Sequence, residues 1–117
     1  MGIPVINISE LTERLDNDFE LFTELTELFF DDSAALMVKI KNSIDNKDHE
    51  SLRKAAHTLK GAVANFAAPG AYEAASVLEM TGRNMELTGV EEQYNTLKSE
   101  IDSVVAEMKK MNANGSF

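Results

Sequence analysis

Apolar residues recur every three or four positions along most of this 117-residue chain. That interval places them on one face of an α-helix, so the pattern predicts four amphipathic helices over about residues 33–46, 48–66, 70–86 and 90–111. Helices joined by such short turns pack as antiparallel neighbours. We therefore expect an all-α fold, an antiparallel up-and-down four-helix bundle, with no strand and no internal repeat.

Two additional short N-terminal helices are expected before the bundle. Asn7 or Ser9 can cap the first, since Asn7 with Glu10 three residues later fits a capping box. Asp16-Asn17-Asp18 ends that helix and caps the next one. The second helix ends at a break or bend at Asp31-Asp32-Ser33, and its apolar side carries five large residues, Leu21, Phe22, Leu25, Leu28 and Phe29.

The length fits one domain over residues 1–117, with an ordered core of about 8–111 and frayed ends at 1–6 and 112–117. The chain has no cysteine, which excludes disulfides, thiol catalysis, zinc–thiolate sites and iron–sulfur clusters. No apolar run approaches the roughly 18 residues of a membrane span, and no signal pattern opens the chain. We expect a soluble, cytoplasmic protein, and the sequence leaves open whether it is free-standing or a domain cut from a longer sensor.

The formal net charge of −9 argues against nucleic acid and against anionic membranes as partners. The charge is unevenly spread, however. No Asp or Glu occurs between Glu50 and Glu73, whereas Arg53, Lys54 and Lys60 do. A local excess of cations suits a site that holds a doubly charged anion such as a phosphoryl group.

This basic stretch also contains a histidine on the predicted outer face of its helix. At about 100° per residue, His57 falls nearly opposite Leu59, the middle of the apolar stripe, so its side chain should be exposed. Gly61, one turn later, leaves the surface beside the ring almost bare. Glycine inside a helix costs roughly 1 kcal/mol relative to alanine, which suggests that the space serves a purpose.

The motif His57-Thr-Leu-Lys60-Gly61, inside an all-helical chain of this length, resembles a histidine-containing phosphotransfer (HPt) domain, and the resemblance runs from about Ile8 to Met111. It implies a phosphocarrier that accepts a phosphoryl group from a receiver-domain aspartate and passes it to another receiver. The implied partners are response-regulator receiver domains and hybrid sensor histidine kinases. The family expectation is a monomer with no metal or cofactor of its own, because the receiver supplies the acidic pocket and the metal.

Each candidate residue has an expected role. His57 is the nucleophile, since a neutral imidazole nitrogen can attack an aspartyl phosphate and release the group again. Lys60 can reach the phosphoryl oxygens, and Gly61 gives clearance for the partner. Lys54, with Arg53, is a weaker candidate for contact with phosphoryl or partner.

A further pair follows from the turn between the second and third bundle helices. If the hairpin pivots near Ala68, His57 and Glu79 lie equally far from it and at the same height. A carboxylate there could accept a hydrogen bond from Nδ1–H and leave Nε2 free, a role that an acidic or amide residue often has in the resembling family. Arg83, one turn on, could steady Glu79 or help to hold phosphoryl. The family often has Leu-Gly near the end of the histidine helix, where this chain has Phe66-Ala67.

Three other functions are compatible with a small helical bundle. A non-catalytic helical bundle that docks a signalling partner remains the alternative. A di-iron bundle is set aside, because neither His49 nor His57 has a Glu three residues before it. The chain has no glycine-rich nucleotide loop, so we expect a phosphotransfer intermediate rather than a kinase.

Overall fold

The computed structural model describes residues 2–117, and all regular structure in that range is helical. The predicted all-α class is thus confirmed. None of the helices in this range is both long enough and apolar enough to cross a membrane. The five helices are α1 (Ile8–Arg14), α2 (Phe19–Asp45), α3 (His49–Ala64), α4 (Pro69–Asn84) and α5 (Val90–Asn114).

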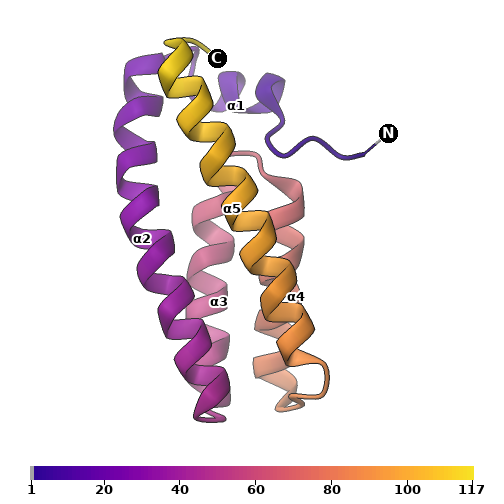
Figure 1. Ribbon diagram of the computed structural model, residues 1–117. Helices are drawn as coiled ribbons and strands as arrows, with labels where there is room; N and C mark the ends of the chain where they lie inside the picture. Colours follow the sequence, from indigo (N-terminus) through magenta and orange to yellow (C-terminus); the bar gives the residue numbers. More distant parts are fainter. Residues whose placement is uncertain (1) are drawn as a thin grey trace.

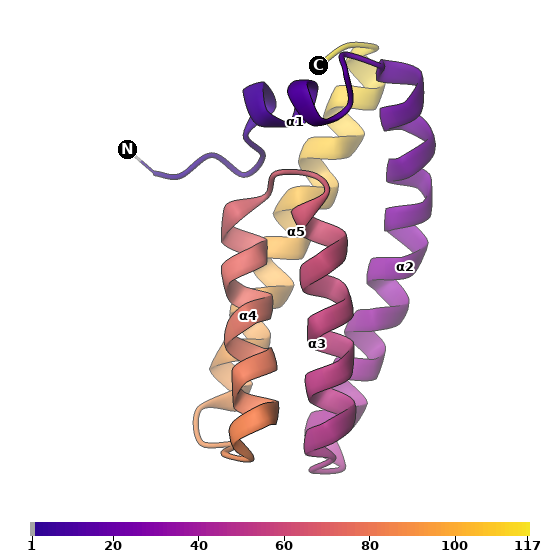
Figure 2. The same ribbon diagram turned by 180° about the vertical axis from the view of Figure 1, so that it is seen from behind.

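Helices α2 to α5 lie side by side, and each runs antiparallel to the next (Figures 1 and 2). Each packs against its neighbour along the chain, and α2 also packs against α5, so that the four enclose one core. Side chains from every one of them are fully buried there, among them Phe22, Ile40, Leu59, Leu78 and Leu97.

The short helix α1 lies above the turn of the α3–α4 hairpin, to one side of the upper ends of α2 and α5 (Figure 2). The Asn7 side chain caps it by accepting a hydrogen bond from the Glu10 amide at 3.1 Å. The Asn7 amide in turn donates to the Ala67 carbonyl at 2.8 Å, and Leu11 is fully buried. Helix α1 therefore closes the core above the turn that connects α3 to α4.

The predicted break at Asp31-Asp32-Ser33 is wrong, because α2 runs through it as one helix of 27 residues. Both aspartates are exposed, so they need no partner in the core. Ser33 is buried, and its hydroxyl donates to the Phe30 carbonyl of the preceding turn. Packing of one continuous face outweighs the weak local preference of Asp and Ser for helix ends. One short helix, rather than two, therefore precedes the four long ones.

The C-terminal segment also differs from the expected frayed end at 112–117. Helix α5 continues through Asn114, and the Asn112 amide donates to Thr26 on α2 at 2.9 Å. The ring of Phe117 packs edge-on against Phe19 and Phe22, with centroids 5.2 and 5.4 Å away. At the other end, residues 2–6 form no helix but Ile6 is buried, and Met1 lies outside the described residues.

Helices α3 and α4 approach each other closely, which decides the geometry of the site. A stripe of small buried residues lines α4 at Ala71, Ala74 and Ala75. Further along, Gly82 lies so near α3 that a Cβ there would be 2.7 Å from the Arg53 amide nitrogen. Because nothing bulky separates the two backbones, side chains near the surface of one helix can reach those of the other.

Candidate functional site

The side chain of His57 projects from the outer side of α3 and is 62% exposed. The opposite face of α3 carries Leu52, Leu59 and Val63, which are completely buried. The amphipathic pattern thus fixes the histidine's direction: burying the apolar stripe turns the imidazole outward. The ring is presented on a rigid helix rather than on a loop.

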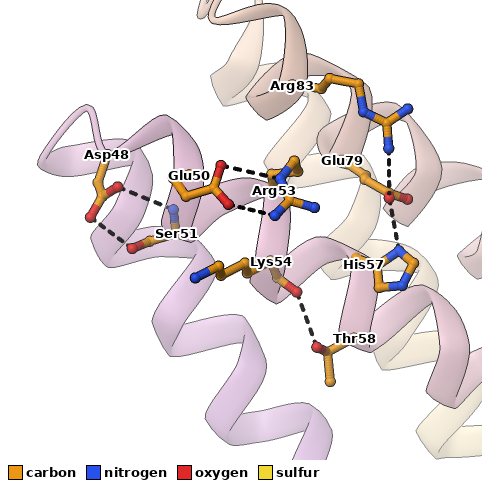
Figure 3. A network of polar contacts seen from close by, with 9 residues as sticks. All are labelled: Asp48, Glu50, Ser51, Arg53, Lys54, His57, Thr58, Glu79 and Arg83. Carbon is orange, nitrogen blue, oxygen red and sulfur yellow. Dashed lines mark hydrogen bonds and ion pairs between the residues drawn. The ribbon is translucent and has the colours of Figure 1, made fainter.

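Glu79, on the neighbouring helix α4, contacts this ring. Its Oε2 atom lies 2.8 Å from His57 Nδ1, and the residue is only 4% exposed (Figure 3). An ionised carboxylate can only accept hydrogen bonds, so Nδ1 carries the proton. In a neutral imidazole the other nitrogen, Nε2, then has its lone pair free.

The carboxylate of Glu79 also has two cationic neighbours. Lys60 Nζ lies 2.5 Å from Oε1, and Arg83 Nη2 lies 3.4 Å from Oε2. The hydrogen bond from Lys60, followed by that from His57, lowers the pKa of Glu79 below its ordinary value, against the opposing effect of desolvation. The carboxylate is therefore ionised at neutral pH and joins three predicted site residues into one cluster.

Gly61 and Lys54 flank this cluster without joining it. A Cβ placed on Gly61 would meet nothing within 4 Å, so the surface beside His57 is open. Lys54 lines a groove between α2 and α3, and its ammonium points away from Glu79 (Figure 3). The structure therefore places Lys54 on the α2 side of His57 and the Glu79 cluster on the α4 side.

The positive field expected on this face is partly neutralised in the fold. Arg53 pairs with Glu50 one turn earlier on α3, and this ion pair raises the pKa of Arg53 (Figure 3). Lys60 pairs with Glu79, which α4 brings in from outside the acid-free stretch. These two cations of α3 thus pair with one acid in the first turn of the same helix and with another on the neighbouring helix α4.

Sequence reasoning missed the pairing of Lys60 with Glu79, because it assigned Lys60 to the phosphoryl oxygens. The hairpin register that placed Glu79 level with His57 could also have predicted this ion pair. Lys60 is one turn after His57 on the same helix, so a carboxylate that reaches one can reach the other. The Lys60 ammonium also lies 5.9 Å from the centre of the exposed Tyr72 ring, a contact that the sequence did not suggest.

Chemically, the site offers one exposed nitrogen nucleophile whose tautomer is set by a buried carboxylate. Open surface at Gly61 gives access to it, and Arg83 supplies a half-exposed cation next to it. Such a site can form and release a bond to an electrophile that a partner presents.

Comparisons with known proteins agree with this geometry. The family model described as "Hpt domain" matches residues 24–107. The fold is also similar to the crystal structure of histidine-containing phosphotransfer protein B (HptB) from Pseudomonas aeruginosa PAO1. The TM-score is 0.89 at 20% sequence identity, over 97% of this chain and 98% of that one. A search of curated proteins found no match.

The structural similarity, at this low identity, establishes the fold. The family match spans well over half of the chain and includes α3, α4 and the residues around His57. This chain therefore belongs to the Hpt domain family, the histidine phosphocarriers of two-component phosphorelays.

Proposed function

We propose that His57 is the phosphoacceptor and that the phosphoryl group is carried on its Nε2 atom. The observation that carries this proposal is the pairing of an exposed imidazole with a buried carboxylate. Glu79 holds Nδ1–H at 2.8 Å, which leaves Nε2 as the unprotonated nitrogen that faces solvent. His49, the other histidine of the chain, begins α3 and has no such partner among the described residues.

The transfer step balances without a proton shuttle. The Nε2 lone pair attacks the phosphorus of an aspartyl phosphate on the partner, an N–P bond forms, and the P–O bond to the aspartate breaks. The aspartate leaves as a carboxylate, and Nδ1–H stays on the ring. The positive charge that develops on the imidazole is stabilised by the nearby Glu79 carboxylate. The reverse sequence returns the group to a receiver.

Arg83, in the cluster, and Gly61 and Lys54, which flank it, assist this step. Arg83 is half exposed beside Glu79 and can turn toward the phosphoryl oxygens, whereas Gly61 lets the receiver approach the ring. Lys54 lies on the α2 side, where it can contact the partner. We propose that the chain acts as a single Hpt domain and a monomer, with receiver domains and hybrid kinases as its partners.

The test is phosphoryl transfer from a panel of radiolabelled, phosphorylated receiver domains. We expect acid-labile, base-stable label on the wild type, none on His57→Gln, and normal labelling of the matched variant His49→Gln. His57→Gln should keep its fold, since the side chain is exposed. Label that persists on His57→Gln would overturn the assignment.

A further inference from the structure

The two oxygens of the Glu79 carboxylate are divided between two partners. Oε2 accepts from His57 Nδ1 at 2.8 Å, and Oε1 contacts Lys60 Nζ at 2.5 Å. The Lys60 side chain is only 23% exposed, compared with 62% for His57. Lys60 therefore reaches into the seam between α3 and α4, toward Glu79 and not toward the solvent where a phosphoryl group would arrive.

A buried carboxylate beside an imidazole has two opposing effects on it. The hydrogen bond fixes the tautomer and the ring orientation, as a nucleophile requires. The negative charge, however, favours the imidazolium, because an opposite charge within about 4–6 Å stabilises the charged form. A second proton would occupy the Nε2 lone pair and remove the nucleophile. An orienting carboxylate thus works best here if its charge is balanced by a cation that does not touch the ring.

Lys60 meets that requirement better than the other charged groups that face Glu79. From α3, Arg53 interacts with Glu79 only at longer range and is bound to Glu50. From α4, Arg83 is 3.4 Å away and half exposed, so water screens it. On α2 and α5, Lys41 and Lys98 form ion pairs with Asp45, Glu91 and Asp102, and neither lysine pairs with Glu79.

We propose that Lys60 is a positioning residue that acts through Glu79: its ammonium balances the carboxylate charge, so that Glu79 orients His57 while Nε2 stays free of a proton. Lys60 touches no reacting atom in this arrangement. The inference rests on the proposed role of His57 as phosphoacceptor. It differs from a direct contact between Lys60 and the phosphoryl group, which the motif alone suggested.

The test compares three variants by ¹⁵N NMR of the histidine ring in the unphosphorylated protein. Lys60→Met removes the charge at similar length, Lys60→Arg retains it, and Lys110→Met removes an exposed lysine of α5 as a control. At about pH 7, Lys60→Met should raise the ratio of imidazolium to imidazole at His57 about tenfold, and the other two should leave it near the wild-type value. In a Glu79→Gln background, Lys60→Met should change the ratio of imidazolium to imidazole at His57 at most about twofold.

Transfer rates, each divided by the wild-type rate at the same pH, complete the test. Lys60→Met should slow transfer at about pH 7 and recover toward the wild type at about pH 9, because a higher pH opposes the second proton that the loss of Lys60 favours. An unchanged imidazolium ratio, or a loss of transfer that is equal at both pH values, would overturn the proposal. If the wild type takes no label at all, the proposed function fails, and the NMR comparison still decides the role of Lys60.

Discussion

Glu79 and His57 form a hydrogen bond of 2.8 Å between a residue that is 4% exposed and a side chain that is 62% exposed. The bond crosses from α4 to α3, so it ties the reactive ring to the rigid interior of the bundle. An exposed side chain would otherwise sample several rotamers. Access for a partner and a fixed orientation of the imidazole are thus obtained together.

Removal of this anchor should slow phosphoryl transfer. We expect Glu79→Ala to lower the transfer rate about tenfold or more, because loss of the residue that orients a metal-ligating histidine typically costs about 10–100-fold and Glu79 orients His57 in the same way. It should also destabilise the fold by about 1–3 kcal/mol, since the partly buried Lys60 ammonium loses its partner. Stopped-flow transfer and chemical denaturation measure the two effects. Glu73→Ala, an exposed acid on the same helix, serves as the control, and equal effects of both variants would contradict the assignment.

Two glycines on facing helices should respond to alanine with opposite signs. Gly61→Ala should raise the free energy of unfolding by about 0.5–1 kcal/mol, because its Cβ enters open space and alanine favours the helix. It should nevertheless slow transfer if a receiver docks over this position. Gly82→Ala should cost about 1–3 kcal/mol, since its Cβ would lie 2.7 Å from the Arg53 amide nitrogen. Urea denaturation checks both signs, and a destabilised Gly61→Ala would contradict the account.

The stability of the bundle should depend on pH partly through Glu79. Its pKa in the folded chain is lowered, chiefly by the hydrogen bond from Lys60, from the ordinary value of 4.5. Below that value the unfolded chain binds more protons than the folded one, so stability falls as the pH falls. The contribution is complete above pH 4.5 and is lost as the pH drops through the lower folded pKa. We expect a shallower acid slope of the unfolding free energy in Glu79→Gln, and a slope identical to the wild type would refute this.

The aromatic cluster at the end of the bundle gives a test of the C-terminus. Phe117→Ala should lower stability by about 1 kcal/mol, because the ring packs edge-on against Phe19 and Phe22. Ile3→Ala, at a residue that is 75% exposed, should change it by less than about 0.5 kcal/mol. Thermal unfolding of the two variants distinguishes a packed C-terminus from a frayed one, for which both changes would be small.

The sequence predicted the fold class and the helix faces because burial patterns are periodic. The stripe on α3 determined that His57 points outward, and the position of the Pro69 turn placed Glu79 level with it. The sequence could not predict that α2 continues through Asp31-Asp32-Ser33. Local propensity there favours a break by only a fraction of a kcal/mol per residue, and the tertiary packing that overrides it is not local.

For the site, the sequence predicted the candidate residues but not all of the contacts between them. The motif singled out His57 and Lys60 as candidate site residues, but it gave no indication that Lys60 reaches across to Glu79. That contact depends on how closely α3 and α4 approach, which Gly82 and the small residues of α4 permit. The packing of Phe117 was missed for the same reason, since its partners on α2 are distant in sequence.

We propose that His57 carries the phosphoryl group on Nε2 because Glu79 occupies Nδ1. The most direct measurement is ³¹P and ¹⁵N NMR of the protein after phosphorylation by a receiver domain, with uniform ¹⁵N labelling to identify the bonded nitrogen. We expect one phosphorus signal coupled to Nε2 of His57 and a proton retained on Nδ1. A phosphoryl group on Nδ1 of His57, or on His49, would contradict the account.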